Sequence, residues 1–513
     1  MSVQETDNNQ EKSPSSKTLS SLSLSASLDE NLALFRRIFA NDGTLRTRMI
    51  NNAYSKEIRC GLIYIDGMAD RNLIQEAIIR PLMSFDFGDI EDLPAEGLID
   101  KIQTQIVNIS EVTLFKQPDD LVSAIVAGQS VLFVDGSSEG LSLNVQGWET
   151  RAISEPSTEK GIRGPREGFT ESLPVNLSLI RRRIQSSDLK IIFTEIGIRS
   201  KTQTCLVYME NLASPDILQD LQKRLEQVKV DHISDTGYLA ELLRDERYSP
   251  FEMIGSTERP DSVVGKMMEG RIALLVEGSP FALTLPYVFV ENFQTSEDYY
   301  LNFYFASVNR MLRVIGAFLS ISIPALYLAL VSFSQEMLPT MLLLSIANAR
   351  KAVPFPTIVE AILMLTVFEI LREAGARIPA AIGQAVSVVG ALVLGQAAVD
   401  ARIVSAPMVI VVGVTGITSL LNPRLTGPLL VIRLFLLLSA FFMGLYGYFL
   451  GLLALVIHLM GLRSFGVSYM LKVGSTKPKD IKDSVFRAPW WYLYVHPVIV
   501  GARNRKRKSG NKP

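Results

Sequence analysis

The sequence has 513 residues, of which 48% are hydrophobic and 20% are charged, and its formal net charge is −1. This length exceeds one ordinary domain, and two cysteines (Cys60 and Cys205) with three scattered histidines argue against a disulfide framework and against a metal cluster. The composition is typical of a soluble protein before about residue 310 and of a membrane protein from there to 461, so we expect an α/β soluble region of two similar lobes followed by an all-α polytopic membrane domain.

The N-terminal part of the chain is polar and then helical. Residues 1–27 are rich in Ser, Asn and Lys, and we expect them to be disordered. Leu28, Leu32 and Phe35 recur at helical spacing and predict a first helix. The N-terminus lacks a basic stretch followed by an apolar core, so no signal peptide is predicted and the soluble region is expected in the cytoplasm.

An internal repeat predicts the two lobes. Residues 62–69 resemble residues 206–213, and residues 128–136 resemble residues 270–278. Both pairs are offset by roughly 140–145 residues and occur in the same order, as in a duplicated supersecondary unit. We therefore predict a first lobe over 28–155 and a second over 191–300; the alternative is chance similarity between short apolar strands.

A connecting segment, 156–190, carries the motif Gly-Pro-Arg-Glu-Gly-Phe and then three consecutive arginines, Arg181, Arg182 and Arg183. Three guanidiniums on one helical turn are suited to a carboxylate-rich surface in an assembly or to anionic lipid headgroups. A solvated basic helix face is the alternative. The soluble region contains no phosphate loop, nucleophile elbow or dinucleotide fingerprint, so we expect a binding or assembly module rather than an enzyme, with no cofactor.

The membrane domain is predicted from four long apolar runs, at residues 314–333, 380–399, 403–421 and 429–461. The last run is longer than one bilayer span needs, so we expect it to tilt, kink at its glycines or project. The tail over 462–513 is strongly basic and is expected to be cytoplasmic. With both termini on that side the number of crossings is even; four are favoured and six are the alternative.

A charged helix is predicted among these apolar runs, over residues 354–377. It carries Glu360, Glu369, Arg372, Glu373 and Arg377. Ionisable groups at membrane depth are costly and usually face a protein interior or a polar path, so these five are candidate ion-path or gating charges. The alternative is an amphipathic helix that lies flat in the interface.

A stripe of small residues follows in the run over 380–399. Gly383, Ser387, Gly390 and Leu394 recur at helical spacing. Such a stripe allows close packing between membrane helices, and it would also suit a narrow, weakly polar pore. These residues are therefore candidates for subunit packing or for a pore lining, with packing favoured.

With these segments in place, the chain resembles the A subunits of the GerA-type spore germinant receptors. The matching pieces are residues 58–67, the Gly-Pro-Arg-Glu-Gly-Phe-Thr-Glu motif at 164–171, residues 176–184, the Pro-Phe-Pro-Thr helix over 354–379 and residues 382–399. The resemblance covers roughly residues 28 to 495.

The resemblance implies a function and partners. Family members act with a multispanning B subunit, which binds the nutrient, and with a C subunit lipoprotein in the spore inner membrane. It further implies that A subunits self-associate in a ring, a pentamer, whose membrane helices form a nutrient-gated ion channel. Under that resemblance Glu360, Glu369 and Glu373 would favour cations, with Arg372 and Arg377 paired against them.

Other functions remain as alternatives. A non-conducting membrane scaffold of the same receptor would explain the large soluble region, and a channel-forming paralogue associated with dipicolinic acid release belongs to the same family. A secondary transporter predicts inverted repeats in the membrane domain, and none is visible in the sequence. Asp66, Asp135 and Glu277 lie at predicted strand ends where a ligand could bind, although turn carboxylates are the commoner explanation.

Overall fold

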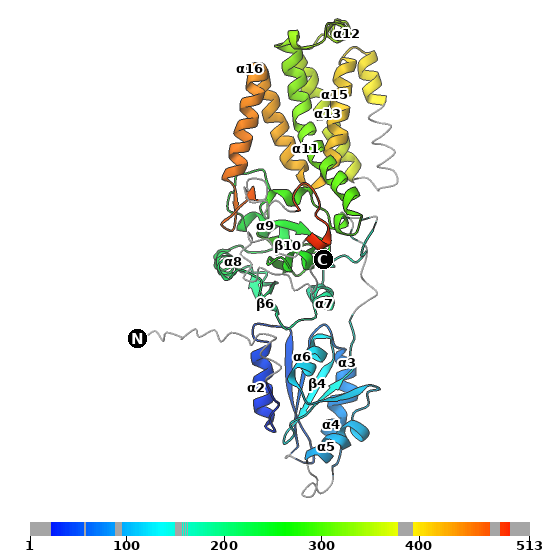
Figure 1. The fold of residues 1–513 in the computed structure, drawn as a ribbon, viewed down its shortest axis with the longest axis vertical. Coiled ribbons are helices and arrows are strands. Elements are labelled where there is room, and N and C mark those ends of the chain that lie inside the picture. Colours follow the sequence, from blue (N-terminus) through cyan, green and yellow to red (C-terminus); the bar gives the residue numbers. More distant parts are fainter. Residues whose placement is uncertain are drawn as a thin grey trace, which may run out of the picture. The chain divides into compact units, whose positions relative to one another are not determined.

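The computed structural model describes most of the chain as two compact units (Figure 1). The described residues are 22–55, 58–87, 95–148, 163–377, 393–471 and 483–492, with the single positions 156, 159 and 161. Residues up to Arg244 and residues 254–286 form the first unit, which we call the sheet unit. Residues 245–253 and residues from Tyr287 to 492 form the second, which we call the helical unit.

The first lobe of the sheet unit is an antiparallel five-stranded sheet in the order β1-β2-β4-β5-β3. The strands are β1 (Leu45–Asn51), β2 (Arg59–Ile65), β3 (Val112–Phe115), β4 (Ser130–Val134) and β5 (Gly140–Leu143). Helices α2 (Leu28–Ile38) and α6 (Pro118–Val126) contribute to one hydrophobic core with Ile63 and Phe133. The other core contains Leu62 and Leu132 and residues of η1 (Ile74–Ile79), α4 (Arg80–Ser84), α5 (Ala95–Lys101) and η2 (Ile102–Ile106). The short helix α3 (Arg71–Leu73) precedes η1 and contributes no buried residue. Successive strand residues point to opposite faces, and both faces are covered, so the central strands are apolar throughout.

The second lobe repeats this topology. Its sheet has the order β6-β7-β9-β10-β8, each strand standing where its counterpart stands in the first lobe. The strands are β6 (Leu189–Ile196), β7 (Thr202–Met209), β8 (Gly255–Thr257), β9 (Ile272–Val276) and β10 (Ala282–Leu285), and the helices are α7 (Leu173–Arg183), α8 (Pro215–Gln227), α9 (Thr236–Leu243) and α10 (Pro260–Met267). The predicted α/β region of two similar lobes is therefore confirmed.

The helix that precedes the strands of the second lobe packs into the core of that lobe. Helix α7 lies in the stretch assigned to the connecting segment, but its apolar face belongs to the core of the second lobe. Leu177 and Ile180 pack there with Ile191 and Val207 of the sheet. In each lobe, therefore, a helix precedes the five strands in the chain and packs against their sheet.

The helical unit is built around α11 (Phe303–Ser332). Around it lie α12 (Thr340–Arg350), α13 (Thr357–Arg377), α15 (Ala406–Leu420) and α16 (Thr426–Gly461), preceded by the short 3-10 turns η3 (Phe289–Phe293) and η4 (Ser296–Tyr299). Further short pieces are η5 (Gln335–Met337), η6 (Pro423–Leu425), η7 (Trp490–Tyr492) and the hairpin of β11 (Arg463–Ser464) and β12 (Val467–Ser468). By length and composition, α11 and the stretch Pro423–Gly461 could each cross a membrane.

The helix α16 reverses direction within its length. Gly444 has φ 59° and ψ −140°, values that no residue inside a continuous helix adopts. Beyond it the chain folds back, so that a Cβ on Gly451 would lie 2.8 Å from Leu436 Cδ2. Figure 1 shows the two arms, in light and dark orange, lying side by side and joined at the top of the view. The apolar run over 429–461, predicted as one long span with a possible kink at its glycines, is therefore a helical hairpin, and each arm is roughly 26 Å long at about 1.5 Å per residue.

Candidate functional site

Glu360 is buried at the junction of three helices. It lies in the first turn of α13, and its Oε2 accepts hydrogen bonds from the backbone N–H and the hydroxyl of Ser405, at 2.9 and 2.8 Å. Ser405 is the N-cap residue of α15, so the carboxylate binds a helix N-terminus, where negative charge is favoured. Arg350, the last residue of α12, approaches Oε1 at 3.5 Å. The structure therefore places this predicted ion-path charge in a fully enclosed contact.

Glu369 lies between two guanidiniums. Its Oε1 accepts a hydrogen bond from Arg433 Nη1 at 3.1 Å, and its Oε2 is 2.6 Å from Arg372 Nη2, one turn further along α13. The side chain of Arg433 is only 4% exposed. Two cations and one anion thus meet between α13 and the first arm of α16, and this cluster is the candidate site that the geometry supports best.

Arg433 was missed by the sequence reasoning. The signal was present, because it is a single arginine inside the apolar run over 429–461. Charged residues within such runs are rare and normally have a named partner. The carboxylate of Glu369 supplies that partner, and the backbone of α11 supplies a second, because Arg433 Nε donates to the carbonyl oxygen of Ser320 at 2.9 Å.

The remaining predicted charges and the small-residue stripe are not brought into this cluster. Arg377 and Glu373 pair with each other at 2.6 Å near the end of α13, and their side chains are 79% and 62% exposed. Leu394 is also exposed. Gly383, Ser387 and Gly390 lie outside the described residues.

The three arginines of α7 have different roles. Arg181 is buried, and its Nη2 donates to Asp42 Oδ2 at 2.6 Å, which joins the second lobe to the chain segment that follows α2. This guanidinium is not available to lipid, because both side chains of the pair are enclosed. Arg182 and Arg183, which are partly exposed, pair with Glu167 of the Gly-Pro-Arg-Glu-Gly-Phe motif at 3.2 and 2.6 Å.

Two of the strand-end carboxylates bind helix N-termini at equivalent places in the lobes. Asp135, after β4, accepts a hydrogen bond from the Leu28 N–H of α2, and Glu277, after β9, accepts one from the Leu173 N–H of α7. Asp66 instead pairs with Arg71. These contacts are structural, as expected for turn carboxylates.

A repeated sequence pattern accompanies these helix starts. Asn31 exchanges two hydrogen bonds with the backbone of Ser25, and Asn176 exchanges two with the backbone of Thr170. The shared pattern is [Ser/Thr]-x-Ser-Leu-x-x-Asn, which begins at Ser25 and again at Thr170. The pattern marks, in each lobe, the helix that precedes the strands.

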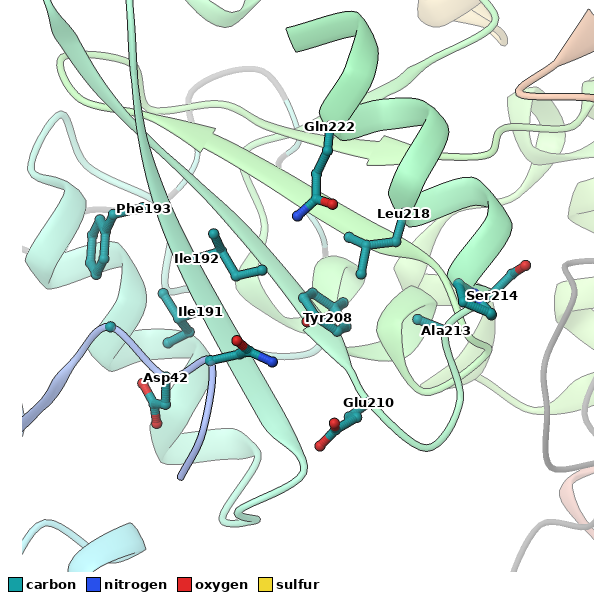
Figure 2. A pocket seen from close by; sticks show the side chains of 13 residues that line it. Asp42, Ile191, Ile192, Phe193, Tyr208, Glu210, Ala213, Ser214, Leu218 and Gln222 are labelled. Carbon is teal, nitrogen blue, oxygen red and sulfur yellow. The ribbon is translucent and has the colours of Figure 1, made fainter. Parts of the chain in front are cut away.

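A surface pocket of about 750 Å³ lies against β6, β7 and α8 (Figure 2). Leu218 and Gln222 of α8 point toward it, and Tyr208 of β7 forms part of its wall. Burial, with a smaller contribution from Glu210, raises the pKa of Tyr208 to about 12, so its hydroxyl stays protonated. Glu210 lies 3.5 Å from the buried Lys190 ammonium.

Among the described residues no group of three His, Cys, Asp or Glu could hold a metal ion.

Comparisons with known proteins show the family of the chain. Residues 33–499 match the family model described as Bacillus/Clostridium GerA spore germination protein. The chain is 39% identical over 488 residues to spore germination protein KA of Bacillus subtilis, covering 95% of this chain and 89% of that protein. It is 41% identical over 451 residues to the uncharacterized membrane protein YfkQ of the same organism, covering 87% of each.

One solved structure is also similar. The crystal structure of the N-terminal domain of the A subunit of the Bacillus megaterium spore germinant receptor GerK3 is 31% identical, with a TM-score of 0.41, and the match covers 52% of this chain and 98% of that one.

Proposed function

This chain belongs to the GerA-type family of spore germination proteins, as an A-subunit type member, and we propose that it forms, with copies of itself, the nutrient-gated ion path of a germinant receptor. In this proposal the A subunits assemble as a ring, a pentamer, in the spore inner membrane, with both termini on the spore-core side. A multispanning B subunit binds the nutrient, and a C subunit lipoprotein completes the receptor. The general role in spore germination follows from the family; the channel, the ring and the partners are the proposal.

The observation that carries the channel is the charge cluster of Glu369, Arg372 and Arg433. Burying an ion pair between apolar helices costs several kcal/mol per ion before the mutual attraction repays it. This desolvation cost is explained if the charged groups act on ions or stabilise one of two arrangements of the helices.

The arrangement of charges along α13 supports a path. Glu369 is largely enclosed, and Arg372 is about a quarter exposed. One turn further on, Glu373 and Arg377 are open to the surroundings. A charged pair on the outside of an apolar helix is unfavourable against lipid, so we propose that this end of α13 faces a water-filled axis or another subunit. Gly383, Ser387, Gly390 and Leu394, which follow in the chain, are proposed to line the same axis or pack against the neighbour.

The test is ion flux from proteoliposomes that contain this chain with its B and C partners, with and without candidate nutrients. We expect nutrient-dependent cation release that is lost when only this chain is omitted. Glu369→Gln should change the flux or its cation preference while the protein level stays normal. Glu336→Gln, an exposed carboxylate in the turn after α11, is the matched control and should leave flux unchanged.

A non-conducting scaffold is the second candidate, and one observation favours it. The charges of Glu360 and Glu369 are compensated inside the described structure, as they would be in a static support. Absence of flux from an assembled, nutrient-binding complex would establish the scaffold role and exclude the channel.

A further inference from the structure

The last described segment of the chain, residues 483–492, lies along the first turns of α11. Arg310 of α11 is fully buried, and its Nη1 donates to Asp483 Oδ1 at 2.8 Å. The same guanidinium is 3.1 Å from Asp298 Oδ2 in η4. Ser307 Oγ accepts a hydrogen bond from the Arg487 N–H at 3.1 Å. The inner side of the segment is thus held to α11 by charge-assisted hydrogen bonds, which are stronger than neutral ones.

The outer side of the segment is aromatic. Five large rings of the segment and of the first turn of α11 are each more than half exposed. They are Tyr304, Phe305, Phe486, Trp490 and Trp491, and we call them the aromatic surface. Trp491 packs edge-on against Phe303 with ring centroids 5.8 Å apart, and Arg487 lies 5.7 Å from the centre of the Trp490 ring. Trp490 and Trp491 are therefore packed against neighbouring side chains, yet more than half of each remains exposed.

The aromatic surface continues into the apolar flank of α11. From Tyr304 the exposed positions Val308, Leu312 and Ile315 follow at helical spacing, on one face of the helix. Tryptophan and tyrosine are enriched where a membrane protein passes from the hydrocarbon core to water, because their rings are apolar and their N–H or O–H groups are polar. A cluster of aromatic rings at one end of an apolar helix face matches the headgroup layer of a bilayer.

The sequence that follows the segment favours an anionic leaflet. Residues 493–513 contain six lysines and arginines and no aspartate or glutamate. Basic residues close to an anionic membrane surface are attracted to it. A sequence in which aromatic residues precede a polybasic stretch combines the apolar and the electrostatic attraction that an anionic leaflet offers.

We propose that the aromatic surface is a docking surface for the headgroup layer of an anionic leaflet, and that residues 483–491 set the depth of α11 in the membrane. The inference rests on the proposed placement of the helical unit in a bilayer. Asp483 and Arg310 connect the segment to the N-terminal turns of α11. Lipid that binds the two tryptophans therefore also restrains this end of the helix. A second copy of the chain would be the competing occupant of this surface.

The experiment measures the depth of the two tryptophans. The chain has three tryptophans, Trp148, Trp490 and Trp491, so Trp148→Phe leaves only the pair in the aromatic surface. The full-length variant is reconstituted in vesicles of phosphatidylcholine and phosphatidylglycerol. These vesicles carry a quenching spin label either on the headgroup or near the end of an acyl chain. We expect the headgroup label to quench at least about twofold more strongly than the chain-end label.

A second reporter separates this inference from membrane insertion itself. Phe449→Trp, in a chain where all three natural tryptophans are phenylalanine, places a probe on the exposed face of the second arm of α16. If lipid labels quench this probe but not Trp490 and Trp491, the helical unit is inserted and the docking surface is refuted. If lipid labels quench neither probe, insertion fails and the proposed function fails with it.

Aqueous iodide distinguishes the competing occupants of the aromatic surface. Strong iodide quenching of Trp490 and Trp491, without lipid quenching, would show that the surface faces water. Protection from both iodide and lipid labels would show that protein covers it. Either result overturns the proposal, whereas headgroup quenching that weakens as phosphatidylglycerol is replaced by phosphatidylcholine supports both its aromatic and its electrostatic part.

Discussion

Arg433 donates a hydrogen bond to the carbonyl oxygen of Ser320, which is the carbonyl that Pro324 leaves without a helical partner. In a continuous helix the N–H four residues later would bind this oxygen, but proline has no N–H. Arg433 Nε takes that place at 2.9 Å. The guanidinium of Arg433 therefore satisfies the unpaired carbonyl of α11 and also pairs with Glu369 of α13. This one side chain of α16 thus connects three helices.

Replacing Arg433 with methionine should destabilise the helical unit strongly. The substitution leaves Glu369 with only Arg372 and leaves the Ser320 carbonyl without a donor, and breaking a buried pair in this way costs about 3–5 kcal/mol. Adding Pro324→Ala restores an N–H for Ser320, so the cost of losing Arg433 should fall by about 1–2 kcal/mol in that background. Thermal unfolding of the four variants in detergent measures both effects.

Arg463→Met, at an exposed arginine after α16, is the control for charge removal and should change stability by less than about 0.5 kcal/mol. Equal costs of Arg433→Met with and without Pro324→Ala would show that the Ser320 hydrogen bond has no energetic role.

The buried pair of Arg181 and Asp42 should hold the two lobes together. Arg181→Met should cost about 3–5 kcal/mol because it leaves the Asp42 carboxylate buried without its cation. The double variant Arg181→Met with Asp42→Leu should recover at least half of that loss, since no uncompensated charge remains. Arg182→Met is the neighbouring control; its pair with Glu167 is partly exposed and should cost less than about 1 kcal/mol. A double variant less stable than Arg181→Met alone would contradict this account.

Both cysteines should be unreactive in the folded protein. Burial, with a smaller contribution from Asp135, raises the pKa of the Cys60 thiol from 9.0 to about 12, and burial also raises the pKa of Cys205. Because the thiolate is the nucleophile, an aromatic disulfide reagent at pH 8 should label neither until the chain is unfolded. Tyr248→Cys, at a fully exposed position, is the positive control and should be labelled at once.

The same pKa shift has a consequence for stability. The unfolded thiol ionises near pH 9 and the folded one near pH 12, so the folded state binds more protons between these values. The stability that the neutral Cys60 contributes is complete below pH 9 and is lost as the pH rises toward 12. Cys60→Ala should remove this part of the alkaline decline in the unfolding midpoint; an unchanged decline would assign it to other groups.

The duplicated sheet could be predicted because buried strands have a recognisable residue pattern. Central strands with both faces covered are continuous apolar runs, and two pairs of such runs recur in order. The helix that opens the second lobe was assigned to the connecting segment, because α7 carries Arg181, Arg182 and Arg183 and resembles a surface helix. The structure shows that Asp42, far away in the sequence, neutralises the first of these.

The helical unit was harder to predict for a related reason. Hydropathy reports that residues are apolar but not which way the chain runs, so the run over 429–461 gave no sign of its reversal. The partner of Arg433 is equally non-local, since Glu369 and Ser320 lie on two other helices. Glu360 and Glu369 were identified as special because they are charged residues among apolar runs, but their contacts depend on packing that periodicity does not encode.

The reversal at Gly444 predicts that this position tolerates only glycine. A side chain there would adopt a φ of 59° with ψ −140°, a region essentially restricted to glycine, and its Cβ would lie 2.9 Å from Phe333 Cβ. Gly444→Ala should therefore lower stability by at least about 1–3 kcal/mol. Gly427→Ala, in the first turn of α16 where no atom lies within 4 Å of the added Cβ, is the matched control and should be neutral or stabilising by up to about 1 kcal/mol.

A distance measurement tests the hairpin independently of stability. Leu434 and Leu453 are exposed positions on the two arms, on either side of Gly444. In a continuous helix they would be about 28 Å apart, whereas packed antiparallel arms have axes about 8–10 Å apart. Spin labels at these two positions should therefore report a distance below about 20 Å, even with the length of the labels included. A distance near 28 Å, together with equal stability of Gly444→Ala and Gly427→Ala, would show that α16 is one continuous helix and that the apolar run over 429–461 crosses the membrane once.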